Sequence, residues 1–294
     1  MGLMPTSRKS KEFKIGVDLI IQHHSSQLNT MSRLQASKRL QQLTPTSPRN
    51  DGFDFADNID GPSSTKLESF SQGLFDDKEV VRIRDAAIAT KFIQGMVLGT
   101  LNPKQYGGFM VQDAAYCFAA VEAVDNAAKE MQHQGMLEFS SLYQEQSKLL
   151  KEYNEDFVKT WHLKNAESIV MGRAADKYVK YEDDVSRQRP KFLAIAMLPC
   201  IMLWPWVANQ LISQVKENNP YYFWFEENKI EEGDLKTFVD SHFSPEEKEE
   251  ALDIFRDGMI NELNFFRDAC NESLVHCPSD LPPCEPNLPS CLLL

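Results

Sequence analysis

The chain has 294 residues and a formal net charge of −12 at neutral pH, with 42% hydrophobic and 25% charged residues. This composition is ordinary for a globular protein, and the acidic balance argues against a general nucleic-acid binder, because phosphate contacts need an excess of Lys and Arg. Six cysteines are too few for a disulfide scaffold of this length, and the first fifteen residues lack the apolar core of a secretory signal. We therefore expect a cytoplasmic protein with no nucleic-acid partner.

Residues 1–75 are polar and rich in Ser, Gln and Asp, with only a weak amphipathic pattern at 29–43. Such a composition predicts a disordered arm. Within it, residues 1–50 hold eight Lys and Arg against two acidic residues, a net +6 that leaves −18 on the rest of the chain. A basic arm on an acidic body suggests contact with an anionic surface, although solvated tails are often biased in charge without any partner.

From about residue 79 the apolar residues recur at helical spacing, and no strand-like alternation appears. The pattern predicts an all-α protein, with helices over 79–100, 104–133, 135–162, 166–186, 190–216, 219–229 and 245–274. The last helix begins with a capping box, in which Ser244 is followed three residues later by Glu247.

One segment, "FLAIAMLPCIMLWPWVA" at 192–208, is apolar enough to raise the question of a membrane helix. It has seventeen residues and contains two prolines, whereas a spanning helix needs about 20 apolar residues. We therefore expect a buried core helix. After residue 275 the chain is rich in Pro and Cys, which precludes a helix there. The sequence thus divides into a disordered arm (1–75), a helical domain (76–275) and a tail (276–294).

Two carboxylates and a thiol interrupt otherwise apolar helix faces. Asp113 shares a face with Phe109 and Tyr116, Glu262 lies in line with four apolar residues of the last predicted helix, and Cys200 lies in the middle of the 190–216 stripe. A lone Cys on such a face usually packs as a small hydrophobe, and a lone carboxylate can lie at the edge of the core. Buried charges are costly, however, and they tend to line polar pockets. We interpret these three residues as a candidate site.

Four short motifs occur in one order from about 80 to 272, and together they resemble the TenA/thiaminase II family. The first is "FIQGMVLGTLNPKQYGGFMVQDAAYCFAA", with a Gln-Asp-x-x-Tyr core at Gln112, Asp113 and Tyr116. The second is "ADKYVKY" followed by "AMLPC", which ends at Cys200. "NPYYFWFEEN" and "NELNFFRDA" complete the set. Each motif is weak alone, but the shared order is specific, and the chain is identified as a divergent member of this family.

The resemblance implies a helical bundle of the heme oxygenase-like type with a pocket between its helices. It also implies hydrolysis of a C–N bond on an aminopyrimidine methylene, a reaction of thiamin salvage. Asp113 would bind the pyrimidine edge, Cys200 would be the nucleophile and Glu262 the proton shuttle, with Phe109 and Tyr116 lining the pocket. A small aminopyrimidine substrate, no cofactor and a homo-oligomer are further implications.

The sequence departs from the family pattern at two positions near the expected substrate. A tyrosine is expected four residues after the cysteine and again four residues after the Trp of the "NPYYFWFEEN" motif, but the chain has Trp204 and Asn228 there. These changes alter the stacking wall and a hydrogen bond near the nucleophile. The alternative is therefore a catalytically divergent module that binds a small heterocycle or acts as an interaction module on the same fold.

Two metal-dependent functions on the same architecture find little support. Heme binding would need an axial histidine early in the domain, and residues 76–132 contain none. A di-iron site would need several convergent Glu and His ligands, and the only Glu-x-x-His sequence runs from Glu130 to His133 near a predicted helix end. We expect no metal site.

Both ends of the chain match lipidation patterns. "MGLMPTSRKSK" fits N-myristoylation at Gly2 with basic residues behind it, and the final Cys291-Leu-Leu-Leu fits prenylation. One acyl chain plus a basic patch would give a reversible membrane anchor. Such short matches also arise by chance, in which case the arm is a plain disordered tail.

Overall fold

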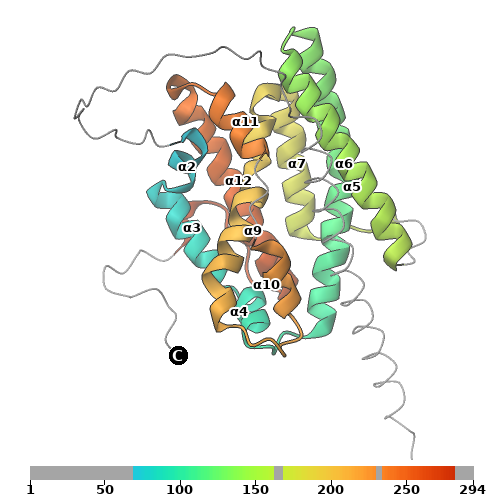
Figure 1. The fold of residues 1–294 in the computed structure, drawn as a ribbon, viewed down its shortest axis with the longest axis vertical. Helices are drawn as coiled ribbons and strands as arrows, with labels where there is room; N and C mark the ends of the chain where they lie inside the picture. The colour runs from blue at the N-terminus through green and yellow to red at the C-terminus, as the bar shows by residue number, and fades with distance from the viewer. Residues whose placement is uncertain (1–68, 162–167, 230–233, 282–294) are drawn as a thin grey trace, which may run out of the picture.

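The computed structural model describes residues 69–161, 168–229 and 234–281, which are drawn as the coloured ribbon in Figure 1. The weak helical pattern at 29–43 and the lipidation motifs at Gly2 and Cys291 lie outside the described residues, so these interpretations stay predictions. Every regular element that the described part contains is helical, and no strand is found there, which confirms the all-α prediction.

The helices follow one another in a single chain order: α2 (Phe70–Phe75), α3 (Lys78–Ile88), α4 (Lys91–Val97), α5 (Pro103–His133), α6 (Leu137–Trp161), α7 (Arg173–Gln188), η2 (Pro190–Phe192), α8 (Leu193–Ala196), α9 (Leu198–Leu211), η3 (Ile212–Gln214), α10 (Tyr222–Asn228), α11 (Asp234–His242), η4 (Pro245–Glu247), α12 (Lys248–Ala269) and η5 (Pro278–Asp280). The long helices α5 and α6 pack along each other on one side of the bundle (Figure 1). Helix α12 runs through the centre and contacts α3, α7 and α9.

The helix predicted over 79–100 is two helices, α3 and α4, because the chain turns at Thr90. The Thr90 hydroxyl accepts a hydrogen bond from the Ile93 amide at 3.3 Å and donates one to the Ala87 carbonyl at 2.8 Å. It therefore starts α4 and closes α3 at the same point, as Ser and Thr N-caps do. Because apolar residues recur at helical spacing on both sides of Thr90, the sequence pattern did not reveal that Thr90 caps a helix.

Two short α-helices were not predicted, and neither was the single 3-10 turn η5, which begins at Pro278 in the tail where no helix was expected. Helix α2 packs Leu74 and Phe75 into the core, and its N-cap is the Ser69 hydroxyl. Helix α11 buries Leu235 and Val239 in the same way. At the other end, Leu281 is also buried, and Arg82 donates a hydrogen bond to its carbonyl at 2.8 Å. The packed domain thus extends a few residues beyond both boundaries expected at 76 and 275.

The apolar segment at 190–216 is broken into η2, α8, α9 and η3 rather than forming one long helix. Pro199 lies at the start of α9, where its missing N–H costs nothing, and so the break falls at Met197. Among the described residues, Pro190–Gln214 is the stretch with the length and apolar composition of a membrane span, but 67% of that window is buried inside the protein. The described stretch is therefore part of the protein core.

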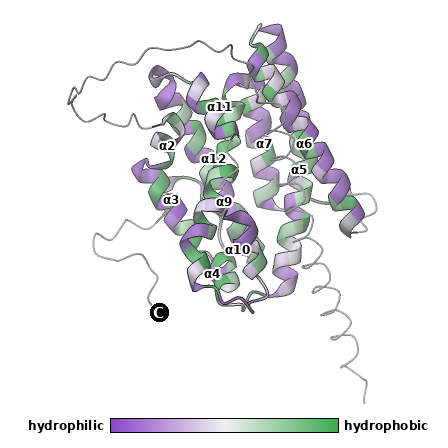
Figure 2. Ribbon diagram, viewed as in Figure 1, coloured by the Kyte–Doolittle hydropathy of each residue, from purple (hydrophilic) through white to green (hydrophobic). Residues whose placement is uncertain are grey.

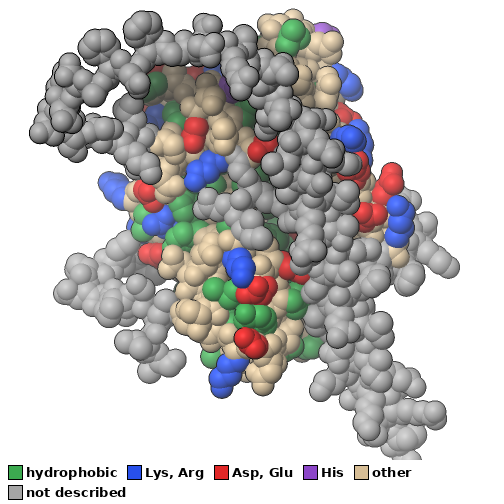
Figure 3. Space-filling view, viewed as in Figure 1, with side chains coloured by type: hydrophobic (Ala, Val, Ile, Leu, Met, Phe, Trp, Pro, Cys, Tyr) green, Lys and Arg blue, Asp and Glu red, His purple; other side chains and the backbone are tan. Residues whose placement is uncertain are grey.

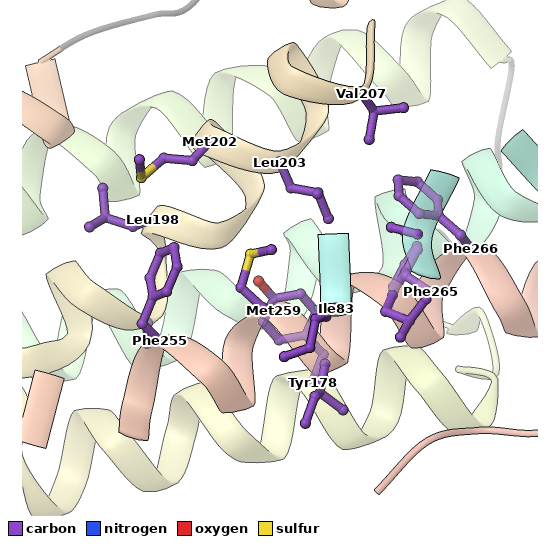
Figure 4. Close-up of a cluster of buried hydrophobic side chains, with 14 of the residues drawn as sticks. Ile83, Tyr178, Leu198, Met202, Leu203, Val207, Phe255, Met259, Phe265 and Phe266 are labelled. Carbon is purple, nitrogen blue, oxygen red and sulfur yellow. The ribbon is translucent and has the colours of Figure 1, made fainter. Parts of the chain in front are cut away.

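The core lies where α9 and α12 face each other, and the hydrophobic sides of the helices turn inward (Figure 2). Figure 4 shows Leu198 and Met202 from α9 opposite Phe255 and Met259 from α12. The two helices approach closely at Gly258, where a β-carbon would come within 2.6 Å of the Pro199 ring. Only glycine lets the two helices meet at this distance.

Candidate functional site

Three carboxyl groups from three different helices lie inside the domain. They are Asp113 on α5, Glu182 on α7 and Glu262 on α12, and the last two are only 1% and 3% exposed. Each occupies the inward face of an amphipathic helix: Tyr178 and Val185, at one helical turn on either side of Glu182, are buried as well. Burial of carboxyls at this depth needs a partner for each.

The partners of the carboxyls are tyrosines and one tryptophan. Tyr153 on α6 donates a hydrogen bond to Asp113 Oδ2 at 3.0 Å, and Tyr116 donates to Glu182 Oε1 at 2.7 Å. Glu262 accepts two hydrogen bonds, from the Tyr178 hydroxyl to Oε1 at 3.0 Å and from Trp204 Nε1 to Oε2 at 2.8 Å. No described Lys, Arg or His forms an ion pair or hydrogen bond with these three carboxyls.

Burial without a cationic partner raises the pKa of all three carboxyls. For Asp113 it raises the pKa from 3.8 to about 6, against the lowering effect of the Tyr153 hydrogen bond. For Glu262 it raises the pKa from 4.5 to about 7, against the hydrogen bonds from Trp204 and Tyr178. For Glu182 it raises the pKa from 4.5 to about 8, against the Tyr116 hydrogen bond and with a further rise from the charge of Glu262. The site can therefore hold and release protons near neutral pH.

Cys200 lies among these carboxyls, in the first turn of α9. Burial raises the pKa of its thiol well above 9, and the negative charges of Glu262, Asp113 and Glu182 raise it further. A helix N-terminus favours a thiolate, but here burial and the acidic neighbours oppose it. The side chain keeps partly accessible surface, as do Asp113 and Tyr116, although all three are strongly desolvated.

Close packing of two helices brings the thiol and Glu262 to the same place. Gly258 lies one turn before Glu262 on α12, and its contact partner Pro199 directly precedes Cys200. The absence of a side chain at Gly258 therefore sets how closely Glu262 can approach Cys200.

Aromatic rings form one wall beside the carboxyls. The Phe109 ring lies 5.8 Å from Trp204 and 5.5 Å from Phe265, and the Tyr116 ring lies 4.8 Å from Tyr178, all measured between centroids. These separations are typical of favourable aromatic pairs. The wall offers flat apolar surfaces of the kind that a heterocyclic ring can stack on.

A groove of about 340 Å³ borders the same wall. Phe109 and Phe265 are common to both, and the remaining lining residues are Lys104, Gln105, Gly108, Gln112, Gly172, Ala174, Ala175, Asp268, Ala269 and Asn271. The Gln112 amide bridges its sides, because it accepts a hydrogen bond from the Gly172 amide at 2.6 Å and donates one to the Val170 carbonyl at 3.2 Å. The start of α7 is thereby fastened to α5 next to Asp113.

The structure brings together six of the seven residues chosen from the sequence: Asp113, Tyr116, Phe109, Cys200, Trp204 and Glu262. Asn228 is separate from them. It ends α10, and its side-chain amide donates to the Trp224 carbonyl at 2.8 Å. Trp224 packs on Trp204 at 5.9 Å, so Asn228 is one residue removed from the wall. A substrate contact for Asn228 stays a prediction.

Sequence reasoning missed Glu182, Tyr153 and Cys117. The signal for Glu182 was present, since Tyr178, Glu182 and Val185 recur at helical spacing on the inward face of α7. Cys117 follows Tyr116, and burial raises the pKa of its thiol, with further rises from the charges of Asp113 and Cys200. Among the described residues, no three His, Cys, Asp or Glu side chains are grouped as ligands for a metal ion.

Residues 78–272 match the model of the TENA/THI-4/PQQC family. The chain belongs to this family. The match covers all four helices that supply the carboxyls and the thiol. No curated protein matches the chain.

Two solved structures show the same fold at low sequence identity. A TenA homologue from P. horikoshii OT3 superposes with a TM-score of 0.57 at 17% identity, covering 69% of this chain and 99% of the other. A TenA homologue from Pyrococcus furiosus gives a TM-score of 0.51 at 20% identity, covering 68% and 99%. At these identities the likeness shows a TenA-like fold, as the motifs predicted, and leaves the activity to be argued from the site.

Proposed function

We propose that the protein is an aminopyrimidine aminohydrolase of the thiaminase II type, which breaks the C–N bond between a pyrimidine methylene and its leaving group. The observation that carries the proposal is the meeting of Asp113, Cys200 and Glu262 beside an aromatic wall. These are the residues to which the family resemblance gives binding, nucleophilic and proton-transfer roles.

Asp113 is suited to hold the pyrimidine edge. Its Oδ2 accepts a hydrogen bond from Tyr153, while Oδ1 has no partner among the described residues. A pyrimidine with an amino group presents a donor and a ring nitrogen side by side. With a pKa of about 6, the Asp113 carboxyl can be ionised and stabilise positive charge on that ring at neutral pH.

Cys200 and Glu262 divide the covalent and proton-transfer work. The thiol is protonated near neutral pH, because its pKa is raised, so addition to the ring needs a proton acceptor close by. Glu262, with a pKa of about 7, can take that proton and later give it to the leaving amine. The C–N bond then breaks and the amine leaves with that proton. A water molecule adds to the methylene, and the proton that it loses returns to the Cys200 sulfur as the bond between the sulfur and the ring breaks.

Trp204 fixes where the proton on Glu262 can lie. An indole N–H only donates, so Glu262 Oε2 must accept from it, whereas the Tyr178 hydroxyl at Oε1 can donate or accept. The replacement of the expected tyrosine by Trp204 thus keeps Glu262 oriented and directs its proton to Oε1 or to the bound substrate.

Incubation of the purified full-length chain with 4-amino-5-aminomethyl-2-methylpyrimidine tests the proposal. We expect ammonia and the hydroxymethyl product in equal amounts, and no product with Cys200→Ala. Turnover that survives Cys200→Ala would refute the assigned nucleophile, and a lack of turnover in the unaltered chain would refute the hydrolase.

The second candidate is a module that binds a heterocycle without turnover. It is favoured by the two hydrogen bonds that already occupy both oxygens of Glu262 and by Asn228, whose amide is bonded to its own helix. The same incubation separates the candidates, because the module would bind the pyrimidine, seen by calorimetry, and leave it intact.

A further inference from the structure

Glu182 is the one buried carboxyl of the site for which the proposed hydrolysis has no use. It lies on α7, is 1% exposed, and has a single hydrogen bond, from Tyr116 to Oε1. Its Oε2 has no partner among the described residues. Oε2 is not one of the fully enclosed polar atoms that lack a partner, so it borders accessible space and can accept an interaction from a ligand.

The groups that face Glu182 are all neutral or acidic. They are Tyr116 and Cys117 from α5, Tyr178 and Tyr181 from α7 itself, Cys200 from α9 and Glu262 from α12. Asp113 adds a third carboxyl to the same interior, and its charge raises the pKa of Glu262 and of Cys200. In the part of the chain that the structure describes, Arg189 acts on Tyr181, but no Lys, Arg or His lowers the pKa of Asp113, Glu182 or Glu262.

We propose that Glu182 is a specificity-determining residue, which selects substrates that carry a positive charge next to the pyrimidine methylene over neutral ones. The position of Glu182 fits this role, because Asp113 is assigned to the pyrimidine edge and Glu262 to the leaving group's proton. Tyr116, which is hydrogen-bonded to Glu182, packs on Tyr178, which is hydrogen-bonded to Glu262. A cation at this point offsets the repulsion among the carboxyls. A bound cation also favours the thiolate of Cys200, which burial and the neighbouring carboxyls disfavour.

This inference rests on the proposed function only in that it assumes a pyrimidine substrate. It does not depend on hydrolysis, so its test measures binding. Two probes differ in one group: 4-amino-5-aminomethyl-2-methylpyrimidine carries an ammonium, and 4-amino-5-hydroxymethyl-2-methylpyrimidine carries a hydroxyl. Dissociation constants are measured at pH 7.5 by calorimetry on full-length protein with Cys200→Ala, which prevents turnover. The same measurement is made with Glu182→Gln or Asp183→Asn added.

The two added variants are matched. Glu182→Gln removes the ability to ionise beside a bound cation and keeps the shape, because an amide oxygen can still accept the Tyr116 hydrogen bond. Asp183→Asn removes a carboxylate from the next residue of the same helix, where Asp183 pairs with Arg187 on the outer side. Thermal unfolding of each variant confirms that it is folded.

We expect the ammonium probe to bind at least about tenfold more tightly than the hydroxyl probe, as removal of a buried charge partner commonly costs that much or more. The preference should vanish with Glu182→Gln and persist with Asp183→Asn. Equal binding of the two probes, or a preference that survives Glu182→Gln, would overturn the inference.

Failure of the pyrimidine proposal gives a different pattern. If neither pyrimidine binds, the proposed substrate class is wrong, and the charge preference is then measured with benzylamine and benzyl alcohol, which differ in the same group. Equal binding of that pair, or none, overturns the role of Glu182 as well. Tighter binding of benzylamine that depends on Glu182 supports it without a pyrimidine.

Discussion

The two faces of helix α7 carry carboxyl groups with opposite kinds of partner. On the outer face Asp176 pairs with Lys180 at 2.7 Å and Asp183 pairs with Arg187 at 2.9 Å, each one helical turn apart. On the inner face Glu182 has a tyrosine hydroxyl and no cation. The outer pairs satisfy their charges within the helix, whereas the inner carboxyl has an oxygen that is left without a partner among the described residues.

This difference separates structural charges from functional ones. Exposed ion pairs contribute little to stability and are replaceable, and on the surface shown in Figure 3 side chains of both signs lie side by side. The inner carboxyls have pKa values raised by burial to between about 6 and about 8, which is costly for the fold and useful for proton transfer. Substitution of the buried groups should therefore change turnover or the pH dependence of stability, whereas substitution of exposed groups should change neither.

The largest effect is expected from removal of the inner thiol. Cys200→Ala should lower turnover of the aminopyrimidine by roughly 10³-fold or more, because no other group forms the covalent bond. The fold should be preserved, since the substitution leaves only a small void. The control is Cys270→Ala, at the end of α12. Equal losses in the two variants would contradict a special role for Cys200.

Glu262→Gln should reduce turnover by roughly 10²–10⁴-fold, the usual scale of general acid–base catalysis. The amide can still accept the hydrogen bond from Trp204, so the change removes proton transfer and keeps the packing. Steady-state kinetics at pH 7 measure the effect. Glu249→Gln, in the exposed first turn of the same helix, should turn over like the unaltered protein. If both variants behaved alike, Glu262 would have no role in proton transfer.

Glu182→Gln should change how stability depends on pH. The folded-state pKa of Glu182 is about 8, above the 4.5 of the unfolded chain, so its contribution is fully present below pH 4.5 and is lost as the pH rises through about 8. The free energy of unfolding of the variant, relative to that of the unaltered protein, should therefore rise by on the order of a few kcal/mol from pH 5 to pH 8.5. Urea unfolding at both pH values measures this.

The outer carboxyl again supplies the control for that measurement. Asp183→Asn should leave the pH dependence of unfolding close to that of the unaltered protein, because a partly exposed ion pair contributes little. If the free energy of unfolding of Glu182→Gln changed with pH in parallel with that of the unaltered protein, burial would not raise the pKa of Glu182.

The smallest effect is expected from Trp204→Phe, which keeps the ring and removes the N–H. The lost hydrogen bond had lowered the pKa of Glu262, so that pKa should rise above about 7. Because Glu262 must be ionised to take the proton of Cys200, the low-pH limb of the rate profile should move to higher pH. Trp206→Phe, whose ring lies against Phe75 and Arg84 instead, should leave the limb in place.

The sequence alone could place Asp113, Cys200 and Glu262, because each interrupts an apolar stripe that helical periodicity makes visible. It could also have placed Glu182, which meets the same criterion. Tyr153 is different: it lies among the polar residues of α6, and its contact with Asp113, forty positions away, depends on how α5 and α6 pack. Periodicity carries no information about such a contact.

Helix boundaries show the same limit. The period of apolar residues continues across Thr90, so the split between α3 and α4 depends on a single hydroxyl that caps one helix and closes the other. Helix α11 was missed because its nine residues bury only Leu235 and Val239, which is too short a pattern to distinguish from a loop. The close approach at Gly258 also needs the partner helix to be known.

The inner carboxyls and Cys200 are proposed to form one pyrimidine site. A crystal structure of Cys200→Ala soaked with 4-amino-5-hydroxymethyl-2-methylpyrimidine tests this proposal. The ring should stack against the Phe109 and Trp204 wall, with its amino edge hydrogen-bonded to Asp113 and its methylene directed at position 200. A pyrimidine found elsewhere, or an interior that stays empty at millimolar ligand while the crystals remain intact, would contradict it.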